Sequence, residues 1–160
     1  MSNLCYAFAG IVCHFYVNLA GIMKTVFAKE LQSTTEAVAK TLSEALDVLA
    51  EHNWCNEEHT FNIRLCLEEA LVNAVVHGNQ NRPECVVSID ICEHGDVCTI
   101  SVRDQGKGFD PNSVLMPDCS ELGGRGVCLI KAFMEDVHFN SEEHCLEMSF
   151  NRDTFCKCRA

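Results

Sequence analysis

The sequence predicts a single α/β domain, and three observations support this class. The chain has 160 residues, which is long enough for one domain with its own core. Its 22% charged and 48% hydrophobic residues are typical of a globular protein rather than a disordered one. Segments of helical periodicity alternate with segments of strand periodicity, and neither a repeat nor a linker divides residues 24–150.

The first part of the chain predicts one strand followed by two helices. Residues 24–30 alternate weakly, as in an edge strand. A helix is expected over residues 34–52, with Ser33 as its N-cap and Glu36 three positions later. The apolar positions of this helix are Val38, Leu42, Ala45, Leu46 and Leu49.

The second helix is expected to begin near Asn56 and to run to His77, where Gly78 and Asn79 end it. Its apolar stripe comprises Phe61, Leu65, Val72, Val75 and Val76.

The rest of the chain predicts a hairpin, a long loop, a helix and two further strands. A glycine between histidine and aspartate at residues 94–96 indicates the hairpin turn. The loop is rich in Gly, Pro, Asp and Ser, and such a long loop in a compact domain is usually a lid or a binding loop. The segments are strands at 85–93 and 97–104, the loop at 105–125, a helix from Gly126, and short strands near 136–140 and 145–150.

Charge and cysteine content limit the classes of function. The formal net charge of -11 argues against direct binding of nucleic acid, because phosphate binding needs a basic face. Protein partners or a magnesium-bound nucleotide fit this charge better. The 12 cysteines include no CxxC pair, and most lie in segments with the pattern of ordinary helices and strands. We therefore expect reduced, mostly structural thiols and a cytoplasmic location rather than a disulfide framework.

Residues 1–22 differ from the rest of the chain. Residues 4–22 are almost wholly apolar, interrupted by His14 and Asn18, and approach the length of a membrane span or signal segment. No Lys or Arg precedes them, and the histidine and asparagine would be costly in lipid. We favour a translation start at Met23, with a membrane anchor as the second interpretation. The expected organisation is an extension at 1–22, one domain at 23–152 and a tail at 153–160.

Polar residues on the second helix form the first candidate site. Glu69, Asn73 and His77 are spaced i, i+4 and i+8, so they line one edge of the helix beside the apolar stripe. A carboxylate at this edge can act as a general base toward a hydroxyl, and an amide oxygen is a suitable ligand for Mg²⁺. Boundary polar residues of an amphipathic helix would give the same pattern, and this motif alone favours that plainer interpretation.

A second candidate is the sequence DQGKGF at the end of a predicted strand. Asp104 has the parity of the apolar side of that strand, so its carboxylate is expected to point inward, where it needs a hydrogen-bond donor. The exocyclic amine of adenine would supply one. Gly106 and Gly108 would let the chain approach a ligand closely. A strand that ends in a glycine turn is the plainer interpretation.

A third candidate is the sequence GGRG at residues 123–126, directly before a helix. Backbone amides at a helix N-terminus bind phosphate, and Arg125 would add positive charge. A flexible hinge is the plainer interpretation. The chain contains no GxxxxGK[ST] sequence, so this is not a P-loop.

Taken together and in this order, the three motifs resemble a known superfamily. The segments LEEALVNAVVHGN, VRDQGKGFDP and LGGRGVCLIKAF are similar to those of the ATPases that include DNA gyrase, heat-shock chaperones, mismatch-repair ATPases and histidine kinases. In detail they look most like the small anti-sigma factor kinases of bacterial partner-switching systems. The resemblance covers nearly all of residues 24–150. It implies the histidine-kinase-like ATPase fold, a two-layer α/β sandwich whose sheet is mixed but largely antiparallel, with helices on one face.

The resemblance also implies roles for individual residues. Glu69 corresponds to the general base and Asn73 to the Mg²⁺ ligand. Glu68 is a rival for the base, but it lies on a different helical face from Asn73. His77 is assigned no chemistry.

The same resemblance implies how ATP is held. Asp104 corresponds to the residue that recognises adenine, and residues 110–125 correspond to the ATP lid. Many relatives have a longer GxGxG pattern where this chain has GGRG, which leaves the individual phosphate contacts open. The remaining residues implied for ATP binding are Gly106 and Gly108 near the base, and Gly124, Arg125 and Gly126 near the phosphates.

The implied function is an anti-sigma factor that is also a protein serine/threonine kinase using ATP and Mg²⁺. It would bind a sigma factor and phosphorylate an anti-anti-sigma antagonist. The main alternative is a non-catalytic binding module in which ATP only sets conformation. The catalytic part of a histidine kinase is less favoured, because the chain lacks room for dimerisation helices. Homodimerisation is implied only by resemblance, and neither a membrane nor nucleic acid is expected as a partner.

Overall fold

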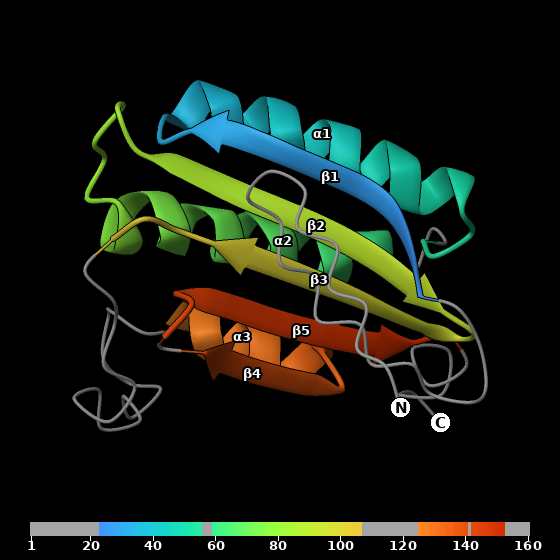
Figure 1. The fold of residues 1–160 in the computed structure, drawn as a ribbon. Coiled ribbons are helices and arrows are strands. Elements are labelled where there is room, and N and C mark those ends of the chain that lie inside the picture. The colour runs from blue at the N-terminus through green and yellow to red at the C-terminus, as the bar shows by residue number, and fades with distance from the viewer. Residues whose placement is uncertain (1–22, 56–58, 107–124, 141, 153–160) are drawn as a thin grey trace, which may run out of the picture.

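The computed structural model describes residues 23–55, 59–106, 125–140 and 142–152, with only the backbone of Arg125. The order of helices and strands along the chain confirms the predicted order (Figure 1). The elements are β1 (Lys24–Gln32), α1 (Thr35–Glu51), α2 (Thr60–Asn73), the π-helical turn η1 (Ala74–Gly78), β2 (Val86–His94), β3 (Val97–Arg103), α3 (Arg125–Phe133), β4 (Asp136–Asn140) and β5 (Cys145–Asn151).

The five described strands form one sheet in the order β1-β2-β3-β5-β4. Each neighbouring pair is antiparallel, and no parallel pair occurs among these strands. β1 lies at one edge, as residues 24–30 predicted, and β4 lies at the other. The three α-helices cover a single face of the sheet, which confirms the expected two-layer α/β sandwich (Figure 1).

The core lies between the helices and one face of the sheet. Successive side chains of a strand point to opposite faces, so every second residue of β2 and β3 is buried against the helices. The buried sheet residues include Val87, Ile89, Ile91, Cys98, Ile100, Val102, Met148 and Phe150. The helices contribute Val38, Leu42, Ala45 and Leu49 from α1, and Ile63, Cys66, Leu67, Ala70 and Leu71 from α2.

The N-cap of α1 is Thr34, so the prediction of Ser33 is wrong by one residue. Thr34 has an extended backbone with φ -130° and ψ 153°, and its hydroxyl accepts a hydrogen bond from Ala37 N at 3.2 Å. Ser33 is buried instead, and its hydroxyl donates to Cys85 O at 3.0 Å. Two successive hydroxyl residues precede the helix, and either one satisfies the capping pattern.

The buried face of α2 also differs from the predicted stripe. Phe61 is 68% exposed and Val72 is 37% exposed. The buried positions instead follow the spacing of Ile63, Leu67 and Leu71. The helix is apolar around most of its circumference, so periodicity alone does not identify the side that meets the sheet.

A cluster around Trp54 joins the two ends of the described fold. Trp54 Nε1 donates to Glu93 Oε2 at 3.2 Å, and Lys24 Nζ lies 3.2 Å from Glu93 Oε1. The guanidinium of Arg152 lies 3.9 Å from the centre of the Trp54 ring and donates to Asn53 O at 3.0 Å. Because Lys24 begins β1 and Arg152 follows β5, the chain enters and leaves the described fold at one end.

Seven cysteines of the described residues are thiols outside any disulfide, in agreement with the expectation of reduced cysteines for these positions. Burial raises the pKa of the Cys66 thiol to about 12, and the nearby carboxylate of Glu69 adds to this effect. This thiol therefore stays protonated and packs as a small apolar side chain.

Some predictions lie outside the described residues. These are the extension at 1–22, the helix start near Asn56 and the tail at 153–160. Within the part of the chain that the structure describes, no helix has the length and apolar character needed to cross a membrane.

Candidate functional site

The first cluster of predicted site residues forms where α2 meets the start of α3. Glu69 and Asn73 are half-buried and lie one turn apart on α2. A Cβ atom built on Gly126 would overlap Glu69 Oε2 and would lie 3.4 Å from Asn73 Nδ2. Glycine at this position is therefore what allows the first turn of α3 to approach the carboxylate and the amide. The structure brings these three predicted residues together.

The neighbouring polar residues of this helix lie outside the cluster. Glu68 and His77 are exposed, whereas Glu69 is half-buried beside Gly126. Of the two adjacent glutamates, only Glu69 shares its surroundings with Asn73. This placement agrees with the preference for Glu69 as the candidate base.

The second cluster forms where η1 meets the end of β3. A Cβ atom on Gly78 would overlap the carboxylate of Asp104, and a Cβ atom on Gly106 would overlap the carbonyl of Gly78. Gly106 N donates to Asp104 Oδ1 at 2.8 Å, and Asp104 N donates to His144 O at 3.2 Å. The end of the second helix thus touches the Asp104 carboxylate directly, with no side chain between them.

The Asp104 carboxyl group is half-buried, and its surroundings affect its charge. Burial raises the pKa of Asp104, while the Gly106 amide and the nearby His144 favour the charged form without cancelling that rise. An ionised carboxylate offers about four lone-pair sites, and the Gly106 N–H occupies one of them. Asp104 therefore retains capacity to accept a hydrogen bond from the amine of a ligand.

The turn η1 sets the position of Gly78. Asn79 N donates to Ala74 O at 2.8 Å and Asn81 N donates to Val75 O at 2.8 Å, rather than to the carbonyl four residues back. Such wider turns occur often at functional sites. The sequence predicted a regular α-helix up to His77, and no residue pattern signals the switch to a π-helical turn at residues 74–78.

The two clusters are close neighbours along the same helix. Asn73 ends α2, and Gly78 ends the adjoining turn η1 five positions later. Sequence reasoning treated Gly78 and Asn79 only as a helix end. The HGN sequence that follows the asparagine helix was the available signal for a closer role of both residues.

Other predicted site residues fall outside what the structure describes. This applies to Gly108, to Gly124 and to the lid up to residue 124. For Arg125 only the backbone is described, and it is the first residue of α3. The helix therefore begins at the glycine motif, as the sequence predicted.

The donor groups of the first cluster fit Mg²⁺ with a nucleotide. Carboxylate and amide oxygens are hard donors of the kind that Mg²⁺ takes, and Mg²⁺ commonly completes its shell with water and phosphate oxygens. Among the described residues, no group of three or more His, Cys, Asp or Glu side chains could hold a metal. Asn73 offers one such oxygen beside a glycine that leaves space at the start of α3, and water and phosphate oxygens would complete the shell of the ion.

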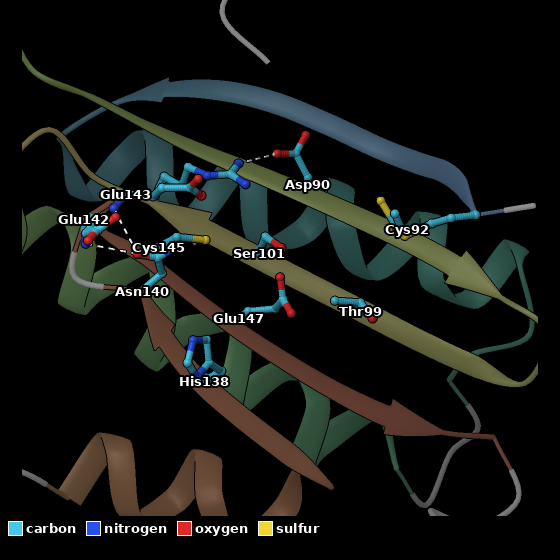
Figure 2. A pocket seen from close by; sticks show the side chains of 12 residues that line it. Asp90, Cys92, Thr99, Ser101, His138, Asn140, Glu142, Glu143, Cys145 and Glu147 are labelled. Atoms are coloured by element: carbon cyan, nitrogen blue, oxygen red, sulfur yellow. Dashed lines mark hydrogen bonds and ion pairs between the residues drawn. The ribbon is translucent and has the colours of Figure 1, made fainter. Parts of the chain in front are cut away.

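A separate hollow of about 410 Å³ lies on the opposite face of the sheet (Figure 2). Its lining residues Asp90 and Cys92 alternate along β2 with the buried Ile89 and Ile91, so they point away from the helices. Apart from Arg103, which is paired with Asp90 at 3.0 Å, the charged lining is acidic. An acidic hollow disfavours phosphate, so the candidate nucleotide site stays on the helix side.

An antiparallel sheet covered on one face by helices, with the site motifs at the helix ends, defines a two-layer α/β domain of a kind that includes ATPases. Comparison with known proteins gives the same class: residues 31–150 match the histidine kinase-like ATPase domain, and the chain belongs to this family.

Two relatives and one solved structure are similar to this chain. The chain is 29% identical over 116 residues to the anti-sigma F factor of Anoxybacillus flavithermus, a match that covers 68% of this chain and 71% of that protein. It is 34% identical over 86 residues to the anti-sigma F factor of Heyndrickxia coagulans, covering 48% of this chain and little more than half, 57%, of that protein. The histidine kinase domain of a blue-light activated histidine kinase from Erythrobacter litoralis shares the fold, with a TM-score of 0.51, 16% identity, and coverage of 81% and 70%.

Proposed function

We propose that this chain is an anti-sigma factor and an ATP-dependent protein serine/threonine kinase. It binds a sigma factor and phosphorylates a serine or threonine of an anti-anti-sigma antagonist. The observation that carries the proposal is the meeting of Glu69, Asn73 and Gly126, a carboxylate and an amide beside the first turn of α3. The similarity to proteins named anti-sigma F factor supports the choice of partners.

The proposed chemistry depends on positioning more than on covalent catalysis. ATP supplies the phosphoryl group, and Mg²⁺ neutralises charge on its phosphates. Asn73 offers its amide oxygen to the ion, and Glu69 orients or deprotonates the acceptor hydroxyl. The backbone at the start of α3 offers amide N–H groups toward phosphate, with Gly124, Arg125 and Gly126 as the proposed contacts.

The base-binding part of the proposal rests on the second cluster. Asp104 accepts a hydrogen bond from the exocyclic amine of adenine, with Gly106 and Gly108 shaping the same side of the pocket. The contact between Gly78 and Asp104 supports this role, because it places the carboxylate at the end of η1, the turn that directly follows Asn73.

The proposal also covers the setting in which the protein works. A sigma factor acts on RNA polymerase, so the proposed location is the cytoplasm. The net charge of -11 suits basic surfaces of protein partners and disfavours direct contact with nucleic acid. We also propose that residues 23–152 form one domain and that two copies of the chain associate as a homodimer.

Phosphotransfer to candidate antagonists tests the kinase. The purified protein is incubated with Mg-ATP labelled at the γ-phosphate and with antagonist candidates from the same genome, and any label is mapped by mass spectrometry. Glu69→Ala should lower the transfer rate by about 10²- to 10⁴-fold, the usual contribution of a general base, while ATP still binds.

The adjacent glutamate provides a matched control. Glu68→Ala removes the same side chain from an exposed position one residue away, and its transfer rate should stay within about twofold of the unmodified protein. Loss of transfer in Glu68→Ala but not in Glu69→Ala would show that the base is wrongly assigned. Absence of transfer by the unmodified protein, despite measurable ATP binding, would favour a non-catalytic module gated by ATP.

A further inference from the structure

Asn79, the residue directly after η1, is fully buried and its side chain is fully hydrogen-bonded. Its Nδ2 donates to Ser33 Oγ at 2.7 Å and to Val86 O at 3.0 Å. Its Oδ1 accepts from Gln105 N at 2.8 Å. A primary amide has two N–H donors and one carbonyl, so all of its groups have partners, and these partners determine which side carries the oxygen.

Gln105 completes this network from the opposite side. Its Oε1 accepts from Val86 N at 2.8 Å, while its own backbone N–H is held by Asn79. Gln105 is exposed, yet both its backbone and its side chain are tied to the start of β2 and to a buried amide. Its position is therefore set by Asn79 and Val86 rather than by packing.

The position of Gln105 controls the second cluster of the site. Gln105 lies between Asp104, which carries the candidate base-binding carboxylate, and Gly106, whose N–H orients that carboxylate. A displacement of Gln105 moves both neighbours. Asn79 has no exposed surface, so it does not touch a nucleotide, and its side-chain oxygen acts on the site through Gln105.

We propose that Asn79 is a positioning residue for base recognition: its side-chain oxygen holds Gln105 so that the Asp104 carboxylate faces the adenine amine. This inference rests on the proposed function, in which Asp104 recognises the base. The competing explanation is that Asn79 only stabilises the fold, because it also joins the end of β1 to the start of β2 through Ser33 and Val86.

Base selectivity separates these two explanations. ITP carries a carbonyl oxygen where adenine carries the amine, so it presents an acceptor rather than a donor to the Asp104 carboxylate. The dissociation constants of ATP and ITP are measured by titration calorimetry for the unmodified protein, for Asn79→Ala and for Ser33→Ala, together with each Tm. A residue that only stabilises the fold changes Tm and leaves the ratio of the two constants alone.

The expected loss of base preference follows only from losing the contact between Asn79 and Gln105, and not from losing the contact between Asn79 and Ser33. The unmodified protein prefers ATP, and Asn79→Ala lowers that preference by about tenfold or more, the size of one lost hydrogen bond to a charged group. Ser33→Ala removes a partner of Asn79 Nδ2 but leaves the contact to Gln105. It should lower Tm and keep the preference within about twofold.

Other outcomes overturn the proposal. An unchanged preference in Asn79→Ala refutes the positioning role while leaving the proposed nucleotide site in place. Absence of nucleotide binding by the unmodified protein refutes both proposals at once. If Asn79→Ala does not fold, Asn79→Asp is measured instead, because it keeps an oxygen toward Gln105 N. Its Tm should fall and its preference should persist, and a lost preference in this variant overturns the proposal.

Discussion

Replacement of Gly78 by alanine tests the second cluster with a single methyl group. The added Cβ would overlap the carboxylate of Asp104. The backbone itself should accept the change, because Gly95 is the described glycine with a positive φ, and Gly78 ends a helical turn. In a helix interior alanine is favoured over glycine by about 1 kcal/mol, so any loss of fold stability must come from the contact with Asp104.

The magnitude follows from what the carboxylate is proposed to do. To make room for the methyl group, the Asp104 side chain must turn away from its hydrogen bond with Gly106 N and from the proposed adenine amine. A hydrogen bond to a charged group contributes about 1.5–3 kcal/mol, which corresponds to about 10- to 150-fold in affinity. Gly78→Ala should therefore weaken ATP binding by that factor while the protein stays folded.

The assay is titration calorimetry with ATP, with Tm measured in parallel. The same substitution in an Asp104→Ala background serves as the control, because the group that the methyl displaces is then missing. In the Asp104→Ala background, Gly78→Ala should change the affinity for ATP by less than about twofold, because the side chain through which the two substitutions are coupled is already missing. An unchanged dissociation constant in Gly78→Ala alone would refute the assignment of Asp104 to the base. An equal loss in both backgrounds would show that the damage passes through the backbone.

Four further predictions concern both clusters and the core. Gly126→Ala should slow phosphotransfer by about tenfold or more by displacing Glu69, with Tm unchanged, and a normal single-turnover rate would contradict the proximity of the two residues. Burial raises the pKa of Asp104, so its ionised form destabilises the fold at neutral pH and that effect disappears as pH falls through the raised pKa; Asp104→Asn should increase Tm at neutral pH more than at acidic pH while weakening ATP binding. Trp54→Phe removes an indole N–H and should lower the free energy of unfolding by about 1–2 kcal/mol in urea titration, whereas a smaller change would mean that its hydrogen bond is dispensable. The Cys66 thiol, with its pKa near 12, should react with a thiol reagent only when the protein unfolds, and rapid labelling of the native protein would disprove its burial.

The order of elements was predictable because each element carries a local signal. Alternation identified the strands at 85–93 and 97–104, and glycine with aspartate marked the turn between them. The N-cap residue of α1 and the buried face of α2 were harder to predict from the sequence. Ser33 and Thr34 both satisfy a capping pattern, and the apolar residues of α2 surround most of the helix, so the tertiary contacts select Thr34 and expose Phe61.

The residues of the candidate site could be selected from the sequence, whereas the contacts that hold them in place could not. Glu69, Asn73 and Asp104 belong to short motifs whose spacing can be read along the chain. The role of Asn79 depends on Ser33, Val86 and Gln105. These partners come from separate segments that no local pattern connects. A hydrogen-bond network between distant segments is a property of the folded chain, so it emerged only from the structure.

The cluster of Trp54, Glu93 and Arg152 offers an attachment point for reporters. It lies at the far end of β2 from Val86, which contacts Asn79, because Val86 and Glu93 are seven positions apart on the strand, or about 23 Å. A fluorophore or a surface tether joined next to residue 24 or residue 152 would therefore sit about a sheet length from the second cluster, around Asp104. Such labels could follow the capture and release of partners by energy transfer without obstructing the reaction.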